Sequence, residues 1–237
     1  MTARPRFLTT RPPDIHSARP WAQFGYVNRR LVDVVHTLVN GCGLSEGARV
    51  LDYGCAARPY RSLLPSGVEY VGADLDGNLE ADVTIGEDGR LPCEDAEFDA
   101  VLSTQVLEHV DDPVAYLAEC ARVLKPGGTL MLSTHGLMYY HRDPEDYWRW
   151  TSSGLVRVVE SANFSVTACH GVLGLAAASV QLFQDATQHR VPAPFRKLYF
   201  LVCQTFIRIL DRRQSPQARI DNGLVIAVRA RRNDQGA

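Results

Sequence analysis

One short segment, residues 135–150, concentrates side chains that can do chemistry. It contains two histidines, three carboxylates and five aromatic residues: His135, His141, Asp143, Glu145, Asp146, Tyr139, Tyr140, Tyr147, Trp148 and Trp150. An imidazole, with an unperturbed pKa of about 6.5, can remove a proton from a hydroxyl group near neutral pH. Aromatic rings offer stacking faces, and carboxylates accept hydrogen bonds from hydroxyl protons. The segment therefore predicts a binding site for a polar, ring-shaped molecule such as a sugar.

The elements around this segment alternate between strand-like and helix-like patterns. Strand patterns cover residues 49–53, 69–74, 81–85, 98–105, 129–134, 164–171 and 222–230. Helical spacing covers residues 21–39, 58–64, 113–124 and 152–162, with Asp111 or Asp112 as N-cap of the third and the KPGG sequence as its stop. This alternation predicts an α/β fold with a mostly parallel, seven-stranded, doubly wound sheet. Ligands bind such sheets at the carboxyl ends of the strands, and residues 135–150 follow one of those ends.

Composition limits the class of protein. The chain has 237 residues, of which 46% are hydrophobic and 22% charged, which is typical of a globular core. Its six cysteines are scattered singly, so we expect a reducing cytoplasm rather than a disulfide framework or a zinc cluster. The first residues lack the apolar core of a signal peptide, and no apolar run approaches the ~18 residues that span a membrane.

Charge is unevenly distributed along the chain. Residues 31–188 hold nine Lys or Arg against 23 Asp or Glu, whereas residues 1–30 and 189–237 are both basic. An acidic centre does not favour a nucleic acid as ligand, so we expect none. It is compatible with a cationic cofactor.

Several motifs occur together in a characteristic order: VLDYGCAA, YVGADLD, IGEDGRLPCEDAEFDAV, STQVLEHVDDP and LKPGG. With them the chain resembles class I S-adenosylmethionine-dependent methyltransferases, whose signature runs from a VLDxGCGxG loop to an LKPGG turn. The resemblance covers residues 49–164 and the final strand, and it implies a Rossmann-like core that binds S-adenosyl-L-methionine.

The resemblance also implies the cofactor-binding residues. Asp74 would bind the ribose hydroxyls, with Asp76 as the alternative, and Glu87 or Asp88 would reach the adenine amino group. The full expected set is Asp52, Gly54, Cys55, Ala56, Arg58, Asp74, Leu75, Glu87, Asp88, Thr104 and Gln105.

The first loop departs from the family pattern, because Ala56 and Arg58 stand where later glycines would be. We expect Ala56 to have backbone angles in an ordinary region, where an added methyl group is tolerated. Arg58 could extend over the loop and pair with the carboxylate of the cofactor. The loop is thus interpreted as modified, not as ruined.

On the acceptor side, an HxxPxDYWRxT pattern resembles a subset of these enzymes found with glycan and glycolipid biosynthesis. The expected substrate-binding residues are His109, Tyr139, Tyr140, Asp143, Tyr147 and Trp148. His141 is the preferred catalytic base, with Asp146 and His135 as alternatives. We expect no metal, because no second histidine follows His141 at i+4.

The expected organisation has four parts: an N-terminal arm and helix (1–45), the cofactor-binding core (46–170), a helical insertion (171–221), and the last strand with its tail (222–237). The insertion carries helical patterns at residues 174–186 and 195–213, the second apolar with basic ends. It would serve as a cap, a homodimer contact, or a peripheral membrane or lipid contact through residues 196–213.

The leading functional prediction is an O-methyltransferase that acts on a saccharide, polysaccharide or glycolipid. We expect it in the cytoplasm, either free or associated with the membrane surface. The alternative acceptor is a polyketide, a quinone or another small molecule, bound between the apolar insertion helices. A catalytically degenerate cofactor-binding protein is a further alternative. The loop lacks the GxGxxG pattern of a dehydrogenase.

Overall fold

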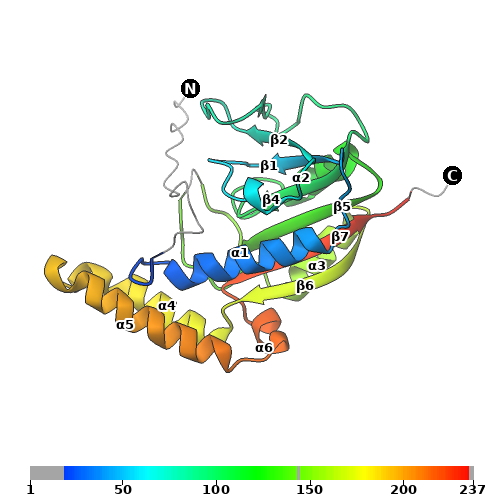
Figure 1. The fold of residues 1–237 in the computed structure, drawn as a ribbon. Coiled ribbons are helices and arrows are strands. Elements are labelled where there is room, and N and C mark those ends of the chain that lie inside the picture. Colours follow the sequence, from blue (N-terminus) through cyan, green and yellow to red (C-terminus); the bar gives the residue numbers. More distant parts are fainter. Residues whose placement is uncertain (1–18, 143–144, 235–237) are drawn as a thin grey trace.

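The computed structural model describes residues 19–142 and 145–234, and its centre is a seven-stranded sheet of order β3-β2-β1-β4-β5-β7-β6 (Figure 1). The strands are β1 (Arg49–Tyr53), β2 (Glu69–Asp74), β3 (Val83–Thr84), β4 (Phe98–Thr104), β5 (Leu124–His135), β6 (Phe164–Val172) and β7 (Val225–Arg232). The first five run parallel, and β7 pairs antiparallel with both β5 and β6. The predicted mostly parallel α/β sheet is confirmed.

The helices are α1 (Gly25–Asn40), α2 (Pro113–Val123), α3 (Ser152–Ser161), α4 (Leu175–Thr187), α5 (Ala193–Arg212) and α6 (Pro216–Asp221), with 3-10 turns η2 (Arg61–Leu63) and η3 (Gln188–Arg190). Two predictions were too long: α1 begins four residues later than expected, and residues 58–64 hold only the η2 turn. The N-cap of α2 is Asp112, whose side chain accepts the N–H groups of Val114 and Ala115.

The LKPGG sequence differs from its expected role. Helix α2 ends at Val123, and Leu124 is already extended, so the KPGG residues form the first part of a long β5 and not a separate stop. The pairing of β5 with β4 shifts register between Phe98 and Ala100, where this added segment joins the regular strand.

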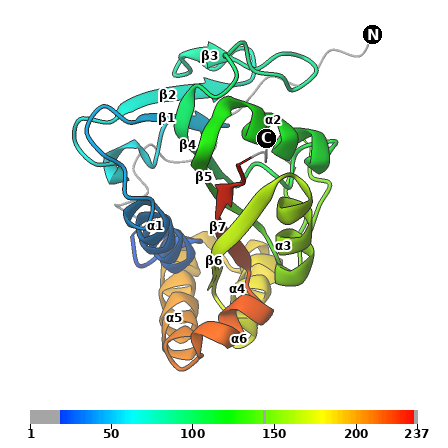
Figure 2. The same cartoon turned by 90° about the vertical axis from the view of Figure 1, so that its right-hand side faces the viewer.

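Helices cover both faces of the sheet, as the alternation of apolar residues along the strands requires (Figure 2). On one face, Leu51 and Val101 pack in a core with Leu117 of α2 and Leu155 of α3. On the other face, the neighbouring strand residues pack in a second core, with α1, α4 and α5; this core includes Val50, Leu102, Met131, Val35, Ala177 and Ile207. The two cores fix the positions of the strand ends.

The order of the strands places a topological switch point between β1 and β4. Strand β2 lies on one side of β1, whereas β4 and β5 lie on the other. The loops after β1 and β4 meet closely here, since a Cβ atom on Gly54 would collide with the side chain of Val106. Ligands of doubly wound sheets bind at such a point.

The predicted insertion between β6 and β7 is present and contains a third helix, α6, that was not predicted. Helices α4 and α5 lie side by side and reach beneath the start of α1 (Figure 1). No helix in the described ranges is long and apolar enough to cross a membrane.

A buried amide network joins the insertion to α1. The Nε2 atom of Gln204 on α5 lies 3.0 Å from the Gln23 carbonyl oxygen, and 3.0 and 2.9 Å from the side-chain oxygens of Gln181 and Gln184 on α4. Its Oε1 atom accepts the backbone N–H of Tyr26 at 2.8 Å. Because buried amides need partners, this network fixes how the insertion docks.

The network predicts a stability difference between neighbouring positions of α5. Gln204→Ala leaves several buried polar groups without a partner and should lower the free energy of unfolding by about 2–3 kcal/mol. Thr205→Ala, at the exposed adjacent position, should change it by less than ~0.5 kcal/mol. Urea denaturation measures both values, and equal losses would show that the network does not hold the insertion.

Candidate functional site

Four loops meet at the carboxyl edge of the parallel strands: those that follow β1, β2, β4 and β5. Most of the expected site residues lie on these loops. Asp52, Asp74, Thr104 and His135 lie at or next to strand ends, and all four are buried. The edge therefore brings together segments that are far apart in the sequence.

The loop after β1 is held against the end of β2 by backbone hydrogen bonds. The N–H groups of Gly54 and Cys55 both approach the carbonyl oxygen of Ala73, at 2.8 and 3.0 Å. Burial raises the pKa of the Cys55 thiol to about 12, so this side chain is neutral and packs without reacting. Asp52 accepts a hydrogen bond from the Tyr70 hydroxyl at 2.7 Å and supports the loop from below.

Asp74 connects the first two loops. Its Oδ2 atom accepts the N–H of Ala56 at 2.7 Å and the amide of Asn78 at 2.8 Å, and its Oδ1 atom accepts the N–H of Leu75 at 2.8 Å. The same Asn78 amide donates to the carbonyl oxygen of Ala56 at 2.9 Å. The Asn78 amide thus donates to the Ala56 carbonyl oxygen and to Asp74 Oδ2. A ligand hydroxyl group could donate to these two oxygens in its place. Asp76, the alternative, is exposed in the following loop.

The backbone at Ala56 contradicts one expectation. Ala56 has φ +46° and Arg58 has φ +53°, so both lie in the left-handed region that favours glycine, and the prediction of an ordinary backbone at Ala56 was wrong. The loop keeps a glycine-type conformation with side chains at these positions. A non-glycine residue there costs on the order of 1 kcal/mol.

Arg58 interacts with the loop between β2 and β3. Its Nε atom donates to the Glu80 carbonyl oxygen, and its Nη2 atom lies 2.8 Å from Asp82 Oδ1. The guanidinium also lies over the Tyr70 ring, 5.5 Å from the centroid. A contact with a cofactor carboxylate stays a prediction, and it would require the guanidinium to leave Asp82.

The remaining cofactor candidates lie on two other loops. Glu87 and Asp88 are exposed in a turn. The Tyr53 hydroxyl donates to the carbonyl oxygen of Gly89 in this turn, and Asp88 Oδ1 accepts the N–H of Arg90. Gln105 has φ +58° and donates its backbone and side-chain N–H groups to Ser133, which joins the loop after β4 to β5.

Three histidines gather at the ends of β4 and β5. The ring centroids of His109, His135 and His141 are 5.6 to 6.3 Å apart. Glu108, which is fully buried, lies beneath them: its Oε1 atom is 3.3 Å from His135 Nε2, and its Oε2 atom accepts the Thr134 hydroxyl. Glu108 was not predicted as a site residue, although an acidic residue just after a strand end beside a histidine was the available signal.

The histidines differ in environment. Burial, followed by the positive charge of Arg149 and the neighbouring histidines, lowers the pKa of His135 to about 2, so its ring is neutral at physiological pH. His109 donates its Nδ1–H to the Glu145 carbonyl oxygen. His141 is half-buried, and its ring nitrogens make no hydrogen bond to other residues within the described ranges. His141 is thus the imidazole of the cluster whose ring nitrogens no other described residue engages.

Arg149 holds the segment in place. It forms a bidentate ion pair with Asp146 and donates to the carbonyl oxygens of Met138 and Tyr139. Asp146 also accepts the backbone N–H of His141 at 2.6 Å. Burial alone would raise the pKa of Asp146, but the hydrogen bonds from Arg149 and His141 lower it. Asp146 therefore positions the chain at His141.

The aromatic residues of this segment divide into two groups. Trp148 donates its ring N–H to the Val110 carbonyl oxygen and stacks near Trp150, so both help to anchor the segment. Tyr139, Tyr140 and Tyr147 are exposed. Glu145 pairs with Arg142. Asp143 lies outside the described residues.

In residues 19–142 and 145–234, no group of three or more His, Cys, Asp or Glu is arranged to hold a metal ion. The expectation of no metal stays a prediction.

The left-handed backbone at Ala56 predicts opposite effects at adjacent positions. Ala56→Gly relieves the strain and should leave the free energy of unfolding unchanged or raise it by up to ~1 kcal/mol. Ala57→Gly, whose φ is negative, only adds flexibility and should lower it by about 0.5–1 kcal/mol. Thermal or urea unfolding compares them, and a larger loss for Ala56→Gly would contradict the loop geometry.

Comparison with known proteins agrees with this fold. The family described as "Methyltransferase domain" matches residues 24–168, which is more than half of the chain. A ubiquinone biosynthesis O-methyltransferase from Dinoroseobacter shibae is 31% identical over 150 residues, covering 56% of this chain and 57% of that relative. The chain thus aligns with only about half the length of the curated relatives it matches.

Solved structures show the same fold at low identity. Haemonchus contortus phosphoethanolamine N-methyltransferase 2, solved with S-adenosyl-L-methionine, has a TM-score of 0.56 and 15% identity, covering 85% of this chain and 53% of that one. The [4+2]-cyclase SpnF has a TM-score of 0.55 and 21% identity, covering 88% and 82%. The family match, supported by the strand order and the loops at the switch point, shows that the chain belongs to the class I S-adenosylmethionine-dependent methyltransferases.

Proposed function

We propose that the chain transfers a methyl group from S-adenosyl-L-methionine to a hydroxyl group of a small aromatic molecule of the quinone type. Two observations support this acceptor over a saccharide. The curated relatives reported above are named as ubiquinone biosynthesis O-methyltransferases. The described carboxylates of residues 135–150, Glu145 and Asp146, are already paired with arginines.

The second observation carries the proposal. Free carboxylate oxygens that accept hydroxyl protons would favour a saccharide, whereas Arg149 contacts both oxygens of Asp146 and Arg142 contacts Oε1 of Glu145. Four aromatic residues of the segment are exposed: Tyr139, Tyr140, Tyr147 and Trp148. Exposed rings suit a flat aromatic acceptor, which binds by stacking.

We propose that the donor binds at the loops of the switch point. The turn at Gly54 would lie under its methionine part, Asp74 would accept its ribose hydroxyls in place of Asn78, and Glu87 or Asp88 would approach its adenine. When bound, S-adenosylmethionine supplies a methyl group on a sulfonium, with a good leaving group. The chain must therefore position the acceptor oxygen and take up its proton.

His141 is the proposed base. Its ring nitrogens form no hydrogen bond to another described residue, and Asp146 accepts a hydrogen bond from its backbone N–H. A phenolic hydroxyl, with a pKa near 10, loses its proton more easily than a sugar hydroxyl, so a neutral imidazole is sufficient. Buried His135 and Glu108 would position His141 from below, and the low pKa of His135 makes it a weaker base.

The direct test is an acceptor screen with labelled methyl donor. We expect methyl incorporation into catechol or hydroquinone compounds and little into saccharides or glycolipids. Incorporation only into saccharides would support the competing acceptor. No incorporation together with intact donor binding would support a degenerate binding protein, a reading that the similarity to a cyclase keeps relevant, because this fold does not fix the reaction.

The base assignment predicts a split between turnover and binding. His141→Ala should lower kcat at least ~100-fold, because a general base contributes about 100- to 10,000-fold, while donor affinity changes less than ~3-fold. His36→Ala, on the exposed face of α1, is the matched control and should change neither. Steady-state kinetics and calorimetry measure the two quantities, and an unchanged kcat would exclude His141 as the base.

The ribose assignment predicts a difference between two nearby carboxylates. Asp74→Ala should weaken the binding of S-adenosylhomocysteine by more than ~10-fold, since it removes a charged hydrogen-bond acceptor. Asp76→Ala should change it less than ~2-fold. Because Asp74 also joins the two loops, Asp74→Asn and a thermal unfolding curve accompany the titration. Equal effects at both positions would contradict the assignment.

A further inference from the structure

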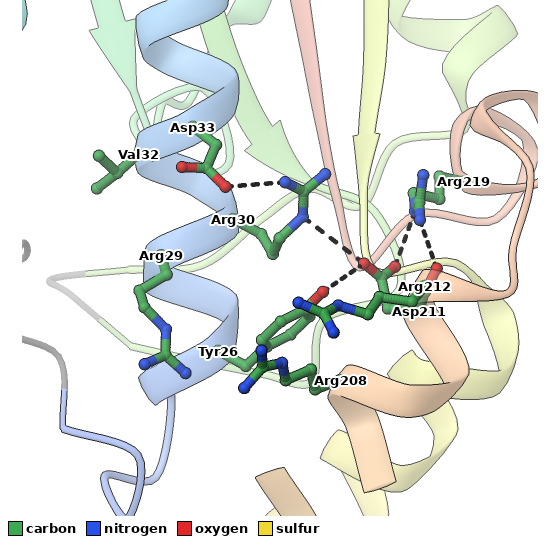
Figure 3. A pocket seen from close by; sticks show the side chains of 9 residues that line it. All are labelled: Tyr26, Arg29, Arg30, Val32, Asp33, Arg208, Asp211, Arg212 and Arg219. Atoms are coloured by element: carbon green, nitrogen blue, oxygen red, sulfur yellow. Dashed lines mark hydrogen bonds and ion pairs between the residues drawn. The ribbon is translucent and has the colours of Figure 1, made fainter. Parts of the chain in front are cut away.

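A cavity of about 640 Å³ lies between α1, α5 and α6, and it shares no residue with the candidate methyl-transfer site (Figure 3). It is lined by Tyr26, Arg29, Arg30, Val32, Asp33, Arg208, Asp211, Arg212 and Arg219. Five of these nine residues are arginines, and two are aspartates. The cavity thus combines residues that are almost 200 positions apart in the sequence.

The two aspartates neutralise two of the arginines. Asp211 is fully buried and accepts a hydrogen bond from the Tyr26 hydroxyl at 3.0 Å and from Arg219 Nε at 2.9 Å. Arg30 Nη1 lies 2.8 Å from Asp33, and Arg30 Nε lies 3.6 Å from Asp211. Figure 3 shows these contacts as one connected group that reaches from α1 to Asp211 and Arg219.

The other three arginines have no such partner. Arg29 on α1, and Arg208 and Arg212 on α5, form no ion pair with any carboxylate in the part of the chain that the structure describes. Figure 3 shows Arg208 and Arg212 next to the Tyr26 ring. Three positive charges that face one cavity repel one another, and a bound anion would remove that cost.

We propose that this cavity binds a phosphate group, carried either by a small phosphate compound or by a lipid headgroup. Guanidinium groups present planar, paired N–H donors that match phosphate oxygens, and an excess of three charges suits a group that carries more than one negative charge. The volume lies within the range of small-molecule sites and leaves room beside a phosphate for a further part of the ligand.

A neighbouring feature of α5 makes the lipid source worth a separate experimental arm. Its outward side carries exposed apolar residues at helical spacing: Phe195, Leu198, Val202, Phe206 and Ile209. Arg208 and Arg212 lie on the same helix, next to these apolar residues. A phosphate that belongs to a lipid would therefore have apolar surface next to its binding site.

The test compares two double variants that remove equal charge. Arg208→Gln/Arg212→Gln changes exposed residues of the cavity, and Arg196→Gln/Arg213→Gln changes exposed residues outside it, one near the start of α5 and one directly after its last residue. Circular dichroism checks that both fold. Calorimetry uses inorganic pyrophosphate as the probe, and co-sedimentation uses phosphatidylcholine vesicles with and without phosphatidic acid.

We expect at least one probe to bind, and binding to weaken ~10-fold or more in the cavity variant but less than ~2-fold in the control. Binding of pyrophosphate without a vesicle preference indicates a small phosphate compound as the source. Binding of phosphatidic acid vesicles alone indicates a lipid headgroup. If neither probe binds, or if both double variants lose affinity equally, the proposal is wrong. None of these outcomes depends on the acceptor of methyl transfer.

Discussion

The buried carboxylate of Asp74 is the interaction on which the ligand-binding edge depends. It accepts hydrogen bonds from the loop after β1 and from its own loop, and so it joins the loop after β1 to the end of β2. A buried carboxylate is stable only when donors surround it, which is why Ala56 keeps a left-handed backbone that directs its N–H toward Asp74. The cost of that backbone is offset by the hydrogen bond to a charged acceptor.

Much of the fold could be predicted because its signals are local. Strand and helix patterns lie in single short segments, and the turns after β1 and β2 carry recognisable residues. The third insertion helix, α6, was missed because it has only six residues, too few for a periodic pattern. The left-handed angle at Ala56 was also missed, although a loop type that favours glycine at that position was itself a warning.

The candidate site was less predictable because its contacts are distant in sequence. Residues 135–150 were identified from composition, but their partners Glu108 and His109 come from the loop after β4. Ion pairing also changes the role that a side chain can take in the site. Asp146 was predicted as an alternative base, whereas its ion pair with Arg149 favours a positioning role, and this pairing is one reason for proposing a different acceptor. The arginine cavity joins α1 to α5, a relation that no local pattern contains.

The central claim is that the carboxyl edge of β1, β2 and β4 holds the methyl donor despite Ala56 and Arg58 in its first loop. Calorimetric titration of the unaltered chain with S-adenosylhomocysteine tests this most directly. The account predicts binding of one molecule per chain, with a dissociation constant in roughly the micromolar range. A titration without measurable binding would contradict it, because the loop would then be a structural remnant and not a cofactor site.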